Sequence, residues 1–136
     1  MKDVEFEVYT ELVNLLRSRF PEIIVSADYN KSSSRFPYVS IRQVDAPLLL
    51  ERQDSSGGVN FWRVTFTVEV YSNNQSTKRA ECKTIAGAID DWFVAHNFDR
   101  LSLTPVENMQ DATIYRLVGR YQATTDGETF YSRRYR

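Results

Sequence analysis

The sequence predicts an α+β domain, with two helices packed on one face of a mostly antiparallel sheet of four to five strands. Two helical patterns and several alternating stretches support this prediction, in the order helix, three strands, helix, two strands. Clustered strands and a C-terminal hairpin favour antiparallel pairing. At 136 residues the chain suits one domain covering 1–136, large enough to fold around its own core.

Both helices are predicted from apolar residues at helical spacing. Residues 3–20 carry Val8, Leu12 and Leu16 on one side, and Pro21 stops the helix. Asp3 is a candidate N-terminal cap. The second helix is expected over residues 76–95, where a stripe is formed by Cys82, Ile85, Ala86, Ile89, Trp92 and Phe93. The stripe predicts that this helix packs on the sheet.

The clearest strand pattern covers residues 59–72. Its apolar side consists of Trp62, Val64, Phe66, Val68 and Val70, and its polar side of Arg63, Thr65, Thr67 and Glu69. The first side belongs to a core, whereas the second is too polar to be buried unaided. Further strands are expected at 22–29, 37–45, 101–109 and 112–126. Pro105 favours an edge or a bend, and Gly119 is a candidate bulge.

Composition narrows the function classes. Hydrophobic residues at 42% and charged residues at 26% are ordinary for a globular protein, and a net charge of -1 gives no overall attraction to nucleic acid or anionic membrane. The single cysteine excludes an internal disulfide and fits a reducing compartment. No stretch approaches eighteen apolar residues, so we expect no membrane span, and the N-terminus does not resemble a signal peptide.

The residues that carry catalysis in other proteins have simpler explanations here. His96, the only histidine, follows the second helix and is expected to cap it or to lie in solvent, and Cys82 is expected to be a small core residue. Asp90 and Asp91 are adjacent, so they form no acid–base pair and suit a solvated face. Gly57 and Gly58 lack the context of a phosphate-binding loop. We therefore predict no enzyme, no catalytic residues, no metal and no cofactor.

Four arginines lie on predicted strands at positions that face away from the helices: Arg42, Arg63, Arg116 and Arg120. If they share one sheet face, that face is positively charged. Three interpretations remain open. The charges are scattered and offset by Glu69 and Asp45, or they contact an acidic partner surface, or they line a wall past which DNA travels.

Two segments combine features of interfaces. The loop at about 46–60 is longer than a tight hairpin and carries Leu48, Leu49 and Leu50, which either extend the preceding strand or anchor a neighbouring subunit. The tail at about 128–136 mixes aromatic and basic residues, and its predicted interface residues are Phe130, Tyr131, Arg133, Arg134 and Tyr135. An RNA-binding tail is the competing interpretation, which the overall charge balance disfavours.

Residues 4–126 resemble the tail terminator, or tail completion, proteins of long-tailed bacteriophages and related prophages. The resemblance is carried by FPYV before a strand, a strand ending in VEVYS, and a helix containing IAGAI with the following W and F. It continues through the NFDRLS link to the final RYQATTD strand. These are patterns rather than a catalytic signature.

The resemblance implies a structural virion protein assembled in the host cytoplasm. Such proteins form a homo-oligomeric ring, typically a hexamer, on the head-proximal end of the tail tube, where they end tube polymerisation and provide the surface to which the head docks. The implied partners are the tail tube protein and a head completion or connector protein, with DNA at most passing through the lumen. A head-completion or connector protein of the head–tail junction is the first alternative, and a small nucleic-acid-binding module is the second.

Overall fold

The computed structural model describes residues 4–27, 35–45, 61–74, 76–106 and 113–131. Two helices and six strands lie in these ranges. In chain order they are α1 (Glu5–Arg19), β1 (Ile24–Ser26), β2 (Tyr38–Asp45), β3 (Trp62–Ser72), α2 (Lys78–Ala95), β4 (Asp99–Pro105), β5 (Tyr115–Thr125) and β6 (Phe130–Tyr131).

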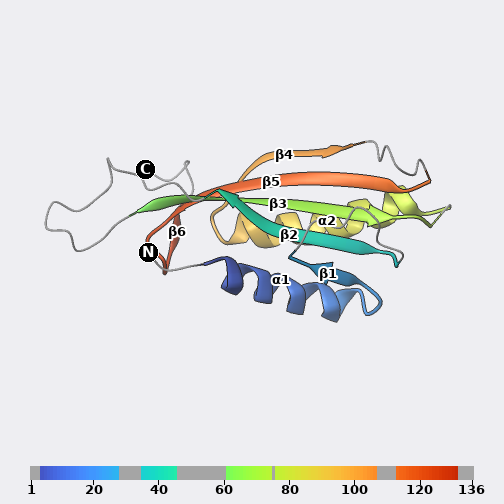
Figure 1. The fold of residues 1–136 in the computed structure, drawn as a ribbon, viewed down its shortest axis with the longest axis horizontal. Helices are drawn as coiled ribbons and strands as arrows, with labels where there is room; N and C mark the ends of the chain where they lie inside the picture. Colours follow the sequence, from blue (N-terminus) through green and yellow to red (C-terminus); the bar gives the residue numbers. More distant parts are fainter. Residues whose placement is uncertain (1–3, 28–34, 46–60, 75, 107–112, 132–136) are drawn as a thin grey trace, which may run out of the picture.

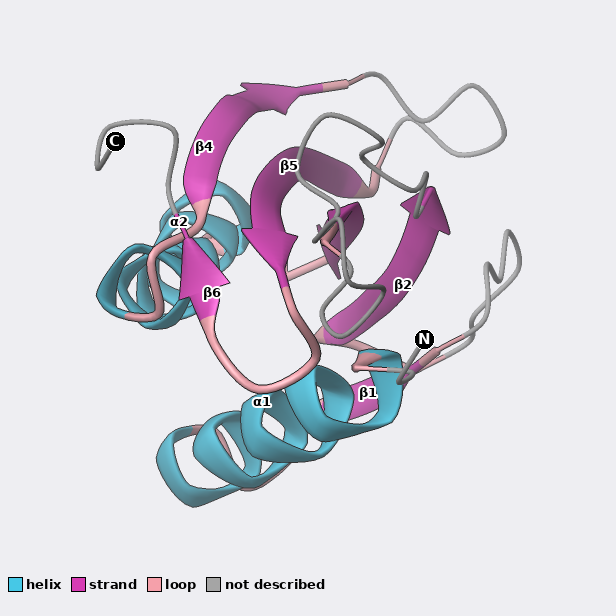
Figure 2. Cartoon of the chain, turned by 90° about the vertical axis from the view of Figure 1, so that its left-hand side faces the viewer, coloured by secondary structure: helices cyan, strands magenta, loops and turns pink. Residues whose placement is uncertain are grey.

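The strands form a single sheet in the order β1-β2-β3-β5-β4, and the short β6 pairs with the end of β5. β1 and β2 are parallel, and all other pairs are antiparallel. Both helices lie on the same side of the sheet, α1 against β2 and α2 against β3, β5 and β4 (Figures 1 and 2). The predicted α+β fold with two helices on one face is therefore confirmed, and β6 is an additional strand.

Helix α1 is held by an apolar stripe and by one polar contact at its start. Val8, Leu12 and Leu16 are buried at helical spacing. The Glu5 carboxylate accepts a hydrogen bond of 2.9 Å from the backbone N–H of Gln43, next to an irregularity in the pairing of β2 with β3. This contact satisfies a backbone donor and fixes the helix start against the strand.

Aromatic rings fill the space between α2 and the sheet. The Phe93 ring stacks on the Tyr121 ring with centroids 4.3 Å apart, and Phe98 meets Phe93 edge-on at 4.9 Å. Phe98 also contacts Phe130 at 4.8 Å. The same cluster therefore supports both the centre of the core and the short strand β6.

The prediction of a bulge at Gly119 is wrong. Gly119 pairs in regular register with Val68 on one side and Leu103 on the other, and the irregularity lies in β4, between Arg100 and Ser102. A Cβ at Gly119 would lie 3.1 Å from side-chain atoms of both Leu103 and Tyr121. The glycine is explained by the close approach of these side chains rather than by backbone conformation. The prediction for Pro105 is confirmed, because it is the last residue of edge strand β4.

Replacing Gly119 with valine is expected to lower the free energy of unfolding by about 2 kcal/mol, because the added methyl groups overpack this part of the core. The measurement is a urea unfolding titration monitored by tryptophan fluorescence. Gly87 is the matched control, since a Cβ there would meet nothing within 4 Å. Gly87→Ala should be at least as stable as the parent, because alanine favours the helix. An unchanged midpoint for the Gly119 variant would contradict the packing explanation.

Candidate functional site

The sheet face turned away from both helices is the strongest candidate for a functional surface. Strand register places on this face the rows Tyr38–Tyr71–Arg116, Ser40–Glu69–Val118 and Arg42–Thr67–Arg120, followed by the pairs Thr65–Gln122 and Arg63–Thr124. We call it the Glu69 face. All four arginines predicted to share a sheet face lie on it.

The centre of the Glu69 face is buried although it is polar. Thr65, Thr67 and Tyr71 are buried, and Glu69 is only 1% exposed. The sequence predicted that such a polar surface could not be buried unaided, because buried polar groups need hydrogen-bond partners. Side chains on the face itself supply some of these partners. Gln122 Nε2 donates a hydrogen bond of 3.2 Å to Thr65 Oγ1 across two neighbouring strands. Polar side chains on this face therefore stabilise the sheet by hydrogen bonds between its strands.

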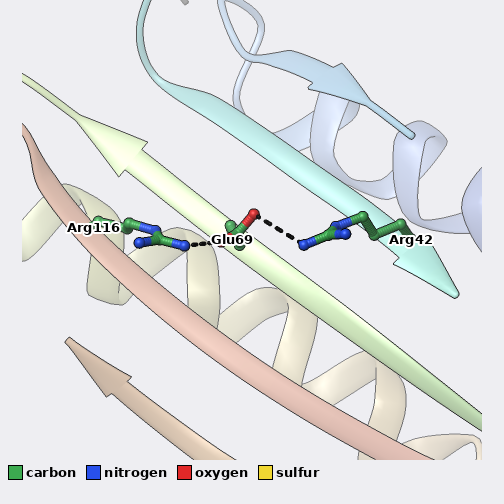
Figure 3. Close-up of polar contacts among 3 residues, drawn as sticks. All are labelled: Arg42, Glu69 and Arg116. Atoms are coloured by element: carbon green, nitrogen blue, oxygen red, sulfur yellow. Dashed lines mark hydrogen bonds and ion pairs between the residues drawn. The ribbon is translucent and has the colours of Figure 1, made fainter. Parts of the chain in front are cut away.

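Glu69 lies between two arginines from the flanking strands (Figure 3). Its Oε1 accepts a hydrogen bond from Arg116 Nη2 on β5, and its Oε2 lies 3.8 Å from Arg42 Nη2 on β2. The Arg116 guanidinium also lies 5.8 Å from the centre of the Tyr71 ring, a cation–π contact. One buried carboxylate is thus shared by two cations and joins the three central strands β2, β3 and β5.

The interpretation that Glu69 offsets the arginines holds for Arg42 and Arg116 only. Arg120 is exposed and Arg63 is half-buried, and within the described ranges neither forms an ion pair. Asp99, the first residue of β4, lies opposite Gln122, and Asp45, the other carboxylate of that interpretation, pairs with Thr65 at the end of β2. The strand register therefore assigns four arginines and three carboxylates to this face, an excess of one positive charge. The sequence did not identify Glu69 as the central residue, because only the strand register shows which arginines flank it.

Phe130 and Tyr131 start the predicted tail interface, and the structure places them in β6. Phe130 packs against the core cluster, whereas Tyr131 is 37% exposed and donates a hydrogen bond of 3.3 Å to Asp126 Oδ2. Hydrogen bonds from the backbone N–H of Thr129, and then of Glu128, hold the pKa of the Asp126 carboxyl below its usual value. The Asp126 side chain therefore joins the turn before β6 by hydrogen bonds to its backbone. The other predicted interface residues lie outside the described ranges: Leu48, Leu49, Leu50, Arg133, Arg134 and Tyr135.

Cys82 is a core residue, as predicted. Its side chain is fully buried, with Sγ 3.7 Å from the carbonyl oxygen of Val70 and 3.6 Å from that of Tyr115. Burial and, to a smaller extent, the nearby Glu81 carboxylate together raise the pKa of the thiol to about 12. The thiolate, which is the reactive form, is therefore strongly disfavoured at neutral pH.

The Cys82 thiol is expected to resist maleimide at neutral pH until the protein unfolds. The measurement is the rate of labelling by mass spectrometry in buffer and in concentrated urea, and we expect labelling in urea to be at least a hundredfold faster. An Arg19→Cys variant, which places a second thiol at an exposed position, is the matched control. In the native state this variant should rapidly take up one label, at the introduced thiol only, while Cys82 stays unlabelled. Rapid labelling of the parent protein in buffer would contradict the burial of Cys82.

His96 is also placed as predicted, whereas Asp90 is not on a solvated face. His96 is the C-terminal cap of α2, and its ring stacks on Trp92 with centroids 4.0 Å apart. Asp90 Oδ1 accepts a hydrogen bond of 2.8 Å from the Tyr121 hydroxyl and lies 3.4 Å from Arg100 Nη1, while Asp91 is exposed. The prediction failed for Asp90 because its partners are contributed by distant strands.

In the part of the chain that the structure describes, no three His, Cys, Asp or Glu side chains are grouped as metal ligands. Likewise, no helix within the described ranges is long and apolar enough to cross a membrane.

The fold has a counterpart among solved structures. No protein-family model matches the chain, and no curated protein has a matching sequence. A chain in a structure described as the virion of a native gene transfer agent particle matches with a TM-score of 0.57 and 16% sequence identity. The match covers 88% of this chain and 92% of that chain. At this identity the similarity establishes a shared fold.

Proposed function

We propose that the protein is a structural component of a phage-like virion, which forms a ring at the head-proximal end of a tail tube. In this role it ends tube polymerisation and offers the surface to which the head docks. The observation that carries the proposal is the shared fold with a chain of a gene transfer agent virion, over nearly the full length of both chains. The sequence resemblance to tail terminator proteins gives the finer assignment.

The Glu69 face suits such a role. In a ring, a sheet face with an excess of arginines can either line the lumen through which DNA passes or contact an acidic partner ring. Arg63 and Arg120 are the residues available for this contact, since Arg42 and Arg116 already flank Glu69. Leu48, Leu49 and Leu50 in the loop, together with the tail residues Arg133, Arg134 and Tyr135, are proposed to contact neighbouring subunits or the tube.

The direct test is tube assembly in the presence of this protein. Purified tail tube protein of the same particle is polymerised with and without it, and tube lengths are measured by negative-stain electron microscopy. A terminator should stop elongation and appear as a terminal ring. Tubes of unchanged length, together with binding to the head portal, would instead support the alternative of a head-completion or connector protein. Binding to neither structure would overturn the virion role.

The arginine excess on the Glu69 face also supports a second candidate, a small nucleic-acid-binding module. Arg63→Glu with Arg120→Glu distinguishes the two functions. The module predicts DNA binding by the parent that falls steeply with salt and that this double variant abolishes. A lumen or ring contact predicts little affinity for free DNA and a loss of tail completion. If the double variant completes tails normally, these arginines have no role in assembly.

The three leucines of the loop give a separate test by light scattering. If they form an assembly arm, changing Leu48, Leu49 and Leu50 to serine should convert a ring of the parent protein into monomers. The measurement is mass across a range of concentrations. A ring formed by both proteins would show that the leucines pack within their own subunit. A monomer in both would require the comparison to be repeated on assembled tails.

A further inference from the structure

A surface hollow of about 400 Å³ lies where the C-terminal end of α1 meets α2 and the start of β2. Its apolar wall is formed by Phe20, Pro21, Ile23, Pro37 and Ile85. Ile23 and Ile85 are buried, whereas Pro21 is exposed at the rim. We call it the α1–α2 hollow. Its volume and apolar lining are within the range of sites that bind side chains or small ligands.

The rim of the α1–α2 hollow carries more negative than positive charge. Glu22 and Glu81 contribute two carboxylates and Arg19 one guanidinium. Glu81 Oε1 accepts a hydrogen bond of 2.5 Å from Ser72 Oγ, and within the described ranges neither carboxylate forms an ion pair. An apolar floor with an acidic rim suits an aromatic side chain flanked by cations.

Residues 132–136 of this chain, with the sequence SRRYR, have that chemistry. Tyr135 lies between Arg134 and Arg136, and Arg133 adds a third cation. Tyrosine and arginine are the residues that most often provide binding energy at protein interfaces, since a tyrosine buries a large ring while its hydroxyl stays near the rim.

Strand β6, which precedes residues 132–136, lies far from the hollow along the subunit. β6 is at the left of Figure 1, whereas α1 runs from there toward the right, where its C-terminal end lies. Asn97 Nδ2 donates a hydrogen bond of 3.2 Å to the carbonyl oxygen of Phe130, which fixes β6 beside the C-terminal end of α2. Glu81 lies near the other end of the same helix.

Chain length makes a contact within one subunit unfavourable. Glu81 precedes Asn97 by more than four helical turns, which corresponds to a rise of about 24 Å. Tyr135 follows Tyr131 by four residues, and these span at most about 14 Å when fully extended. A chain of this length that starts at Tyr131 is therefore too short to bring Tyr135 to the Glu81 rim of its own subunit. The hollow of a second copy, placed end to end with the first, can lie within reach of Tyr135.

We propose that residues 132–136 of one copy dock in the α1–α2 hollow of the next copy, with Tyr135 among the apolar residues and the arginines beside Glu22 and Glu81. The contact is head-to-tail, so repetition produces a closed ring or an open filament. The inference rests on the proposed ring and specifies which surfaces its subunits use.

The test is cross-linking through two introduced cysteines in the full chain. Arg19→Cys marks the rim of the hollow and Arg136→Cys marks the tail, and both substitutions leave Tyr135, Glu22 and Glu81 in place. The buried Cys82 gives low background in a short reaction. Proteins carrying one cysteine each are mixed, treated with a short bis-maleimide and separated by denaturing electrophoresis. We expect a dimer only in the mixture, and a ladder of multimers from the doubly substituted chain.

Three outcomes decide the proposal. A mixed dimer and a ladder support it. A doubly substituted chain that links only within itself would overturn it, because the tail would then reach its own hollow. Absence of any link would also overturn it. If no link forms but light scattering still shows a ring, the subunits of the ring meet through other surfaces. If a ladder forms but the protein does not stop tube elongation, the contact between the tail and the hollow is supported and the proposed terminator function is wrong.

Charge substitutions provide an independent readout by sedimentation. Glu22→Lys places a cation beside the docked arginines and is expected to weaken self-association at least tenfold. Glu11→Lys is the matched control, since Glu11 is exposed on α1 and lies outside the hollow, and it should change association less than twofold. Equal effects of the two substitutions would indicate a general effect of net charge and would contradict docking at this site.

Discussion

Replacing Glu69 with glutamine is expected to lower the free energy of unfolding by about 3 kcal/mol, although the two side chains have nearly the same size. Glu69 is 1% exposed and holds Arg116 by a hydrogen bond and Arg42 by an ion pair. Removing its charge leaves two guanidinium groups close together on a largely buried face, and breaking a buried ion pair in this way typically costs about 3–5 kcal/mol. The lower end applies because both arginines retain contact with solvent.

A urea titration measures this loss, provided that the slope of the unfolding transition is unchanged. Arg120→Gln is the control, since it also removes one charge from the Glu69 face but at an exposed position. We expect a change within about 0.5 kcal/mol for that variant. A Glu69→Gln protein as stable as the parent would show that the two arginines do not depend on the carboxylate.

The arginines of the Glu69 face fall into two groups, according to whether they contact Glu69. Arg42 and Arg116 are committed to the fold, so their replacement should reduce stability and, through stability, any function. Arg63 and Arg120 form no ion pair within the described ranges, so their replacement should leave the protein folded and test the proposed contact of this face with a partner. Variants at the second pair are therefore the informative ones for assembly.

The fold class could be predicted because its signal is local. Alternation in β3 and helical spacing in α1 and α2 each repeat several times, so the side of each element that packs between the helices and the sheet is visible in the sequence. β6 was missed because two residues are too few to show a period. Gly119 was misread because Leu103 approaches it from the neighbouring strand β4, and because the bend of the Tyr121 ring toward it, two residues along β5, is not visible in the sequence.

The candidate site was predictable only in part, for a related reason. Period-two spacing placed four arginines on one sheet face, and this is correct. Which of them meet Glu69 depends on the register between β2, β3 and β5, and a shift of one residue would move every side chain to the other face. The α1–α2 hollow could not be predicted at all, because its wall combines residues from the end of α1, the start of β2 and the middle of α2.

Replacing Phe93 with alanine is expected to be the most destabilising single change, with a loss of about 4 kcal/mol. The Phe93 side chain is fully buried, and its ring contacts those of Tyr121, Phe98 and Phe66. Its removal leaves a cavity between α2 and the sheet that the packed helix and strands cannot fill. Because Phe98 in turn supports Phe130, the same change should loosen β6.

Phe6→Ala is the matched control for this experiment, since it makes the same chemical change at a side chain that is 73% exposed on α1. Its expected effect on the free energy of unfolding is within about 0.5 kcal/mol. Hydrogen exchange then separates the two consequences of Phe93→Ala, because amide protection in β6 should fall more than global stability alone requires. If β6 loses protection only in proportion to global stability, the aromatic cluster does not link the core to the strand that carries the tail. A disproportionate loss, by contrast, would mean that core packing controls how firmly β6 is held, and with it the proposed contact of residues 132–136 with a neighbouring subunit.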